Sequence, residues 1–234
     1  MAQAREERSR VAVMSLEKLG GQTRVSDRAF DALYTAIIHG DLTAGSRLQV
    51  RDLAESLGTS MMPVREALNR LEEFGLVETL PYRGAVVKSF SQEELLEIYS
   101  VRTVLESQAV KLGVERCDDG CARELEAQLA QVRKALDAQD PTAYLDAEEA
   151  MLTCLFERSG NHTLMGFIRT LWARSRYYKL VGVKDIFEQG QVAVLYDEAA
   201  QFVEGASARD EQVTLGALLR ALKRAEDGIR AELP

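Results

Sequence analysis

The side chains most often used for catalysis or metal binding are sparse in this sequence. Two histidines and three cysteines occur in 234 residues. Cys117 and Cys121 are four residues apart, a spacing that could form part of a metal site, but no histidine or third cysteine lies near them in the sequence. An odd number of cysteines in a long chain is typical of free thiols in a reducing compartment. We therefore expect these two residues and Cys154 to be ordinary thiols.

The histidines give little support to an enzyme. His39 and His162 lie far apart in the sequence, and each is better interpreted as an ordinary polar residue. No catalytic Cys–His or Ser–His pair and no glycine-rich phosphate loop is apparent. An enzyme in the C-terminal part is therefore an alternative that the sequence disfavours, and we expect no cofactor.

A second set of residues is suited to contacts with nucleic acid. Arginine binds phosphates and guanine edges, helix N-termini approach phosphates, and glycine lets a backbone come close. The residues of this set are Arg51, Ser60, Met61, Met62, Arg65, Arg83 and Gly84. A single arginine on an exposed helix is more often solvated than bound to DNA, so the order of the surrounding elements decides the interpretation.

Two helices are predicted ahead of Ser60. Ser26 can cap the first, in which apolar residues recur at helical spacing until Gly40. A turn or short strand follows over 42–48, and a second, short helix is predicted over 50–57. This pair leads directly into the helix that begins at Ser60.

A third helix and a hairpin complete this N-terminal unit. Ser60 offers the N-cap, Pro63 falls in the first turn, where its missing N–H costs nothing, and an apolar stripe continues up to Gly75. Strand-like runs over 76–80 and 85–87 enclose a basic turn, which predicts a hairpin. This order of elements is typical of a winged helix-turn-helix, in which the second helix of the pair enters the major groove of DNA.

The net charge of −8 appears at first to argue against a nucleic-acid partner, because phosphate contacts supply most nonspecific affinity. The charge is unevenly distributed, however. Residues 1–90 contain 12 Lys and Arg and 12 Asp and Glu, whereas residues 91–234 contain 17 and 25. The N-terminal part is therefore neutral, and its cations can still gather on one face. We expect binding that needs a specific site and is sensitive to salt.

Beyond Phe90 the sequence predicts helices alone. Ser91 followed by two glutamates is an N-cap signal for a long helix. The predicted helices are 91–112, 119–138, 142–158, 161–180, 191–204 and 209–231. The predicted fold class is mainly α, with a winged helix-turn-helix of three helices and a small β-hairpin ahead of a bundle of about six helices.

The chain divides into three predicted parts. Residues 1–25 form a flexible extension, 26–90 the winged helix-turn-helix, and 91–234 the helical bundle. No apolar stretch approaches the roughly 20 residues that cross a bilayer, and the charged N-terminus does not resemble a signal peptide. We therefore expect a cytoplasmic protein with no membrane partner.

Residues 27–90 resemble the winged helix-turn-helix of the GntR superfamily, most clearly in LQVRDLAESLGTSMMPVREALNRLEEFGLVETLPYRGAVV. The continuation LLEIYSVRTVLESQAV resembles the start of the ligand-binding FCD domain of its FadR-type branch. The resemblance implies that Arg51, Ser60, Arg65, Arg83 and Gly84 contact DNA. The chain departs from the family where relatives often have Arg and Thr before the proline.

That departure places Met61 and Met62 at the end of the helix that faces DNA. A methionine cannot make the bidentate contact with guanine that an arginine makes. We expect a shifted base preference, for example towards contact with a thymine methyl group. The operator sequence of relatives therefore cannot be assumed for this protein.

The resemblance also locates a pocket in the bundle. Many relatives bind a divalent metal there through an aspartate, a histidine four residues later, and two histidines on the last helices. Those positions fall on Glu148, Leu152, Ala199 and Ala221, of which only the glutamate could be a ligand. We therefore predict a pocket without metal that is roomier and more apolar, and accepts a larger or more lipophilic effector.

Three more residues are predicted at this effector site: Tyr99 and Arg102 in the stretch YSVRTVLE, and Asn161 in SGNHTLMGFI. In relatives the arginine faces the interior. It could clamp a ligand carboxylate, or pair with Glu148 or Glu106 as a structural ion pair, because a buried arginine needs a partner. The asparagine could contact the ligand or cap its helix.

The sequence thus predicts a DNA-binding transcriptional regulator. We expect a homodimeric repressor that binds double-stranded operator DNA and is controlled by a small-molecule effector, such as an organic acid or acyl derivative. The main alternative is a ligand-blind DNA-binding or interaction protein whose helical core is filled by side chains.

Overall fold

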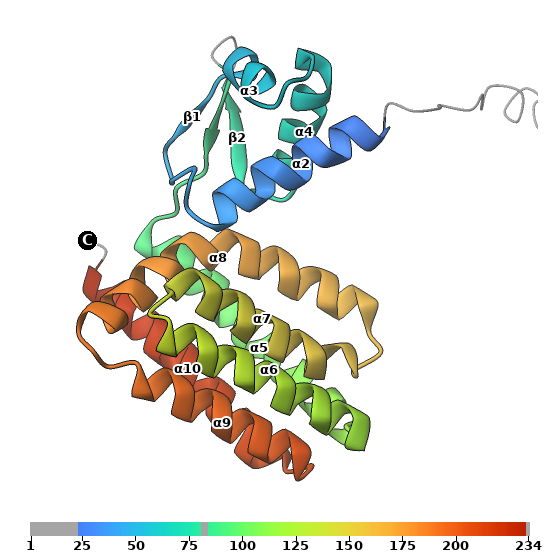
Figure 1. Ribbon diagram of the computed structural model, residues 1–234, viewed down its shortest axis with the longest axis vertical. Coiled ribbons are helices and arrows are strands. Elements are labelled where there is room, and N and C mark those ends of the chain that lie inside the picture. The colour runs from blue at the N-terminus through green and yellow to red at the C-terminus, as the bar shows by residue number, and fades with distance from the viewer. Residues whose placement is uncertain (1–22, 81–83, 233–234) are drawn as a thin grey trace, which may run out of the picture.

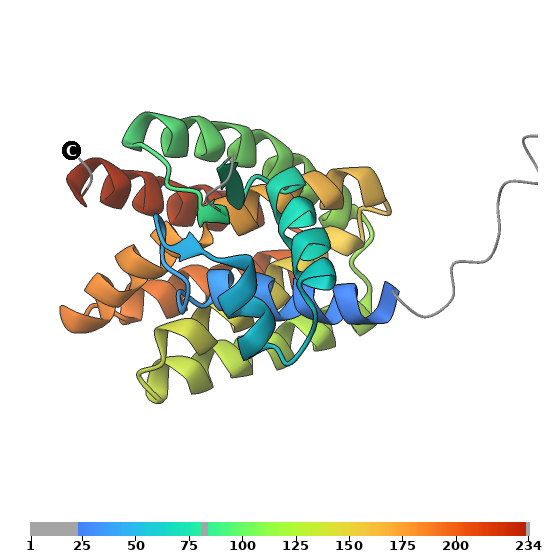
Figure 2. The ribbon, with the colours of Figure 1, turned by 90° about the horizontal axis from the view of Figure 1, so that it is seen from above.

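The computed structural model describes residues 23–80 and 84–232. Most of the predicted flexible extension and the predicted contact Arg83 therefore lie outside the described residues. Figure 1 shows a smaller N-terminal unit stacked on a larger helical bundle, and Figure 2 shows the same arrangement from above.

The N-terminal unit contains helices and a small sheet. Its elements are α2 (Thr23–Ile38), β1 (Arg47–Leu48), α3 (Val50–Ser56), α4 (Met61–Glu73), β2 (Val77–Leu80) and β3 (Gly84–Val87). The sheet has the antiparallel order β1-β3-β2. The fold is that of a winged helix-turn-helix. The predicted hairpin is present, and β1 adds a third strand to it.

Gly84 begins the returning strand of the hairpin where two strands come close together. It has a φ of +84°, and a Cβ atom there would lie 2.7 Å from the carbonyl oxygen of Leu48. A side chain would therefore clash with the backbone of β1, so both the conformation and the close approach favour glycine.

The helical bundle follows after Phe90. Its helices are α5 (Gln92–Glu115), α6 (Asp119–Asp137), α7 (Pro141–Glu157), α8 (His162–Glu188), α9 (Ala193–Ser207) and α10 (Glu211–Glu232). Ser91 and Glu94 form the full capping box of α5, each side chain bonding to the other residue's backbone N–H. Asp118 and Asp140 cap the next two helices. Local sequence signals thus set most of the helix starts.

Each unit has its own hydrophobic core. Val64, Ala67 and Leu71, on one face of α4, are fully buried in the N-terminal core. Ala173 of α8 is buried in that same core, so the bundle contributes directly to the packing of the smaller unit. The helix α8 therefore belongs to both parts of the molecule.

Three helix boundaries differ from the prediction. Ser26 is buried inside α2, which begins at Thr23, so it does not cap the helix. The helix α8 continues through Gly182, because the buried residues Val183 and Phe187 keep its apolar face against the bundle. Gly205 lies inside α9 rather than after it. In the ranges that the structure describes, no helix is long and apolar enough to span a bilayer.

Gly205 marks a close crossing of α9 and α10. A Cβ atom on it would lie 2.7 Å from both the backbone nitrogen and the hydroxyl oxygen of Thr214. We predict that Gly205→Ala lowers the unfolding free energy by about 1–3 kcal/mol, because the helices would have to separate. The matched control is Gly166→Ala, since its Cβ would meet no atom within 4 Å. That change should raise stability by up to about 1 kcal/mol through helix propensity. Urea denaturation measures both, and equal effects would contradict the close crossing.

Candidate functional site

A concave surface of about 690 Å³ lies on the N-terminal unit, between α3, α4 and the sheet. It is lined by four of the predicted DNA-contacting residues: Arg51, Met61, Arg65 and Gly84. Both arginines are exposed. The structure therefore brings side chains from two helices and the wing to a single surface, which is the geometry that a helix-turn-helix presents to a major groove.

The leading end of α4 faces solvent. Met61 and Met62 have exposed fractions of 51% and 57%, which is unusual for apolar side chains of this size. On the opposite side of the same turn, Pro63 and Val64 are buried and anchor the helix. Ser60 occupies the predicted N-cap position, but its side chain makes no capping hydrogen bond. Its hydroxyl group is available to another acceptor or donor.

Sequence reasoning missed three polar residues of this surface: Gln49, Asn69 and Thr79. One of them had a detectable signal. Asn69 lies four residues after Arg65, which lies four after Met61, so these side chains follow one face of α4. The other two come from a helix cap and a strand, whose positions depend on the tertiary fold.

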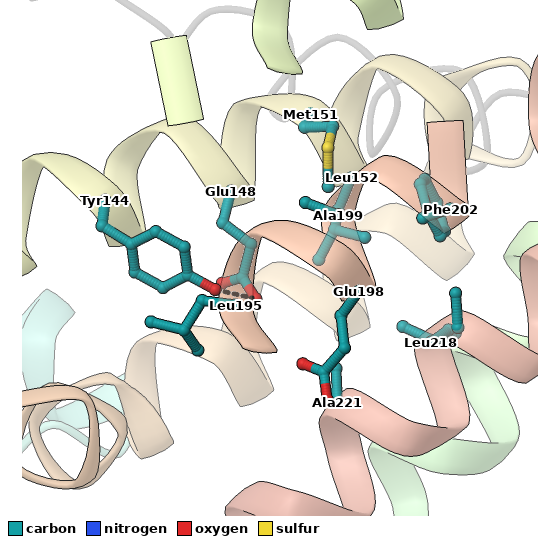
Figure 3. A pocket seen from close by; sticks show the side chains of 11 residues that line it. Tyr144, Glu148, Met151, Leu152, Leu195, Glu198, Ala199, Phe202, Leu218 and Ala221 are labelled. Atoms are coloured by element: carbon teal, nitrogen blue, oxygen red, sulfur yellow. Dashed lines mark hydrogen bonds between the residues drawn. The ribbon is translucent and has the colours of Figure 1, made fainter. Parts of the chain in front are cut away.

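The residues that the resemblance assigned to the family's metal positions line one pocket in the bundle, here called the central pocket (Figure 3). Glu148, Leu152, Ala199 and Ala221 all contribute to it. The expectation of a roomy pocket was wrong, because its volume is about 30 Å³, close to that of one water molecule. Larger neighbours fill the space: Tyr144, Met151, Leu195 and Phe202.

The central pocket does not fit a metal ion. Leucine and alanine have no donor atoms, and Glu148 is paired with Lys179 through a side-chain hydrogen bond. Burial raises the pKa of Glu148, but the charge and hydrogen bond of Lys179, with Arg224 and Arg102 farther away, outweigh it and hold that pKa below its ordinary value. A lysine thus supplies the positive charge beside this carboxylate.

Arg102 pairs with Glu106, not with Glu148. Its Nε donates to Glu106 at 2.7 Å and its Nη1 to Ser175 at 3.2 Å. The indole nitrogen of Trp172 donates to the same carboxylate oxygen at 2.8 Å. Burial lowers the pKa of Arg102, but the adjacent carboxylate outweighs this and raises it above its ordinary value. Arg102 is thus held as a cation in a structural pair.

Tyr99 and Asn161 lie away from the central pocket. The guanidinium carbon of Arg102 lies 4.5 Å from the centre of the Tyr99 ring, a cation–π contact. The side chain of Asn161 accepts a hydrogen bond from the backbone of Leu164 at 3.0 Å, and so caps α8. Of the two roles considered for this asparagine, capping is therefore the one for which the structure shows a hydrogen bond.

A second cavity, here called the side cavity, lies between α5, α8, α9 and α10. Its volume is about 360 Å³, and its lining includes Tyr99, Tyr177, Tyr178, Lys179 and Arg224. The sequence indicated only the first of these residues, because a cavity between four helices depends on how they pack.

The helix α8 also joins the bundle to the N-terminal unit. Arg174 donates to the backbone oxygen of Phe74 at 2.9 Å, and Arg176 donates to that of Ile38 at 3.3 Å. Tyr178 accepts a hydrogen bond from the backbone of Phe90 at 2.6 Å, in the segment that links the two units. This part of α8 is therefore in direct contact with the helix-turn-helix unit and with the linking segment.

The cysteines are free thiols, as expected. Burial raises the pKa of Cys117 to about 12, and that of Cys154 to about 12 as well. Thiols with such pKa values are protonated at neutral pH and are poor nucleophiles.

A winged helix-turn-helix followed by a helical bundle defines a class of two-part transcriptional regulators. The model of the bacterial regulatory proteins of the gntR family matches residues 25–87, and the FCD domain model matches residues 97–224. The chain therefore belongs to the GntR family of transcriptional regulators, in the group that has an FCD domain.

Named relatives agree with this class. The HTH-type transcriptional regulator McbR of Escherichia coli is 33% identical over 135 residues, which are 58% of this chain and 61% of McbR. The transcriptional repressor GlaR of the same species is 26% identical over 153 residues, 63% of this chain and 69% of GlaR. The first alignment thus spans less than two thirds of the relative.

Solved structures share the fold. The structure of E. coli McbR superposes with a TM-score of 0.79 at 24% identity, covering 89% of this chain and 98% of that one. A GntR transcriptional regulator from Rhodococcus sp. RHA1 gives a TM-score of 0.76 at 22% identity, covering 89% and 99%.

The pairing of Glu148 with Lys179 can be tested by Lys179→Met. Because the pKa of Glu148 is lowered in the folded state, its stabilising contribution is present above its ordinary pKa and is lost as the pH falls through the lowered value. Without the lysine, a buried carboxylate loses its nearest cation, so we predict a loss of about 3 kcal/mol at pH 7.5 that shrinks at pH 5, where the carboxyl group can be protonated. Urea denaturation at the two pH values measures this.

The matched control for this test is Lys223→Met. Lys223 pairs with Asp227 on the exposed face of α10, where solvent screens the interaction. The control should leave the unfolding free energy unchanged at both pH values. A Lys179→Met protein as stable as the control at pH 7.5 would show that the buried pair has no such role.

Proposed function

We propose that this protein is a homodimeric repressor that binds double-stranded operator DNA through α4 and the wing and releases it in response to a small organic acid. The residues proposed to contact DNA are Arg51, Ser60, Met61, Met62, Arg65, Arg83 and Gly84. The observation that carries the proposal is the single concave surface on which four of these residues meet. The two arginines bind phosphate or base edges, and the exposed methionines contact bases.

The repressor role has support from a relative's name. GlaR is named a transcriptional repressor. Repression needs only that the regulator occupies the operator and that the effector weakens this binding, and a coupling of about 1–3 kcal/mol is enough to change occupancy 5- to 150-fold. In this proposal the protein works in the cytoplasm and catalyses no reaction.

Exposed apolar side chains on the bundle support a dimer. Val101 and Val104 on α5 have exposed fractions of 47% and 68%, and Phe167 on the neighbouring helix α8 has 61%. Exposed apolar side chains that together form a contiguous patch often mark a protein interface, whereas single ones are common on any surface. A two-fold dimer would place two recognition helices about one DNA turn apart.

A ligand-blind regulator is the second candidate. The nearly filled central pocket favours it, because about 30 Å³ leaves no room for an organic ligand at the family's metal positions. A thermal-shift screen separates the two candidates, since a ligand-blind core gives no specific stabilisation.

DNA binding is tested with a labelled fragment of the gene's own promoter region. We predict specific binding in fluorescence anisotropy, a strong decrease of affinity with salt, and a salt slope smaller by about one in Arg65→Ala. Arg123→Ala is the matched control, because Arg123 is equally exposed but lies on α6 of the bundle. Undetectable or salt-insensitive binding by the native protein would overturn the proposed function.

The dimer is tested by Val104→Glu. A charge at this exposed position would be buried without a partner in the dimer, so we predict a monomer in analytical ultracentrifugation at concentrations where the native protein is a dimer. Leu219→Glu, at an exposed apolar position on α10, should leave the dimer intact. If both variants remain dimers, the interface lies elsewhere.

A further inference from the structure

The side cavity has the size of a small-molecule site. Its volume of about 360 Å³ falls within the range of roughly 300–1,000 Å³ that is typical of ligand pockets, whereas the central pocket is about a tenth as large. Val181 and Val194 line it and are partly exposed, with fractions of 41% and 37%, so they mark a route to solvent. A small molecule could therefore enter without unfolding of the bundle.

Tyr99 lines this cavity and carries a buried polar group without a partner. The residue is 1% exposed, and its hydroxyl group has no hydrogen-bond partner within the described part of the chain. A buried hydroxyl without a partner is unfavourable, and native structures contain few of them. A ligand oxygen that reaches this hydroxyl, once the side chains that cover it shift, would give it a partner.

Two cations line the same cavity. Lys179 pairs with Glu148, and Arg224 pairs with Glu198 at 2.8 Å, so both cations are held by carboxylates of the central pocket. A lysine has three donors and an arginine five, and Arg224 uses Nε and Nη2 for its partner. Donors thus remain for a further acceptor. The acidic residue in the lining is Asp185, and both cations already have a carboxylate partner, so a ligand would be held by their remaining donors.

We propose that the side cavity is the effector site of this regulator and that it binds a small carboxylate with an aromatic or short aliphatic body. This inference rests on the proposed function, in which an effector controls DNA binding. The carboxylate lies near Lys179 and Arg224 and accepts a hydrogen bond from Tyr99, and the apolar body lies against Tyr177, Tyr178 and the valines. The site is offset from the central pocket, where the chain holds ion pairs in place of a metal.

The position of the cavity explains how its occupant reaches the DNA-binding unit. Tyr178 lines the cavity and also accepts the hydrogen bond from the backbone of Phe90 in the linking segment. Tyr177 and Leu180 lie within about 4 Å of the place that a Cβ on Gly40 would occupy, at the end of α2. A ligand that moves these side chains changes the contacts between α8 and the helix-turn-helix.

The test uses the full-length protein and isothermal titration calorimetry with benzoate, phenylacetate and octanoate as probes, and phenylacetamide as the uncharged counterpart of phenylacetate. We expect at least one carboxylate to bind, and phenylacetamide to bind about tenfold more weakly than phenylacetate if phenylacetate is that ligand. Binding should also lower the affinity for promoter DNA. If none of the carboxylates binds, the proposal is overturned.

Two glycines allow the cavity to be filled without a clash. Gly182 and Gly228 line it, and a Cβ atom on either would meet nothing within 4 Å. We expect Gly228→Leu to remain folded and to lose carboxylate binding at least tenfold. The matched control is Gly166→Leu, a helical position with equally open space outside the cavity, which should bind as the native protein does. Binding that survives in Gly228→Leu and Gly182→Leu would place the ligand elsewhere.

Tyr99→Phe tests the polar contact separately. It removes only the unpartnered hydroxyl, so the variant should be as stable as the native protein but bind the carboxylate several-fold more weakly. Tyr144→Phe makes the same change in the central pocket and should not alter ligand affinity. Promoter binding by the native protein without ligand separates a failure of this site from a failure of the proposed function. If the protein binds DNA but no carboxylate, only the effector site is overturned. If the native protein does not bind DNA, the proposed function as a regulator is overturned.

Discussion

The structure depends on the pairing of charges inside the helical bundle. Arg102 is bonded to Glu106, Lys179 to Glu148 and Arg224 to Glu198, and each pair joins groups that are largely removed from water. A buried charge that loses its partner costs several kcal/mol, so the helices that supply these groups cannot slide independently. The Lys179–Glu148 pair joins α8 to α7, and the Arg224–Glu198 pair joins α10 to α9. Arg102 and Glu106 both lie on α5, and their bonds to Ser175 and Trp172 join that helix to α8.

This arrangement gives α8 a special position. Lys179 pairs into the bundle, while Arg174 and Arg176 of the same helix donate to backbone carbonyls of the helix-turn-helix unit. Ala173 is part of the core of that unit. A change in the bundle that rotates or shifts α8 must break or rearrange these contacts. Allosteric control therefore needs no separate relay, because a single helix contacts both units.

The sequence was sufficient for features that depend on local signals. The capping residue Ser91 and the glycine at Gly75 mark helix ends, and the apolar stripe of α4 identified its buried face. Tertiary packing decided the rest. The strand β1 forms because it can pair with the edge of β3. The helix α8 continues through Gly182 because its far end is buried. The sequence offered two glutamates as partners of Arg102 and could not decide between them. The small volume of the central pocket follows from neighbours on several helices, which spacing alone does not reveal.

The negative charge of the protein is compatible with DNA binding because of where it lies. The excess of acidic residues belongs to the bundle, since residues 91–234 contain 25 of them and 17 Lys and Arg. Figure 1 shows α3 at the end of the molecule that lies away from the bundle helices α9 and α10. At physiological salt, exposed charges separated by more than about 8 Å are largely screened, so the bundle repels DNA only weakly at that distance. In the proposed function, affinity then depends on cations at the concave surface, such as Arg51 and Arg65, and on the fit of α4. If this surface binds DNA as proposed, two arginines in the described part of its lining supply limited nonspecific attraction, so selectivity must come from base contacts and shape.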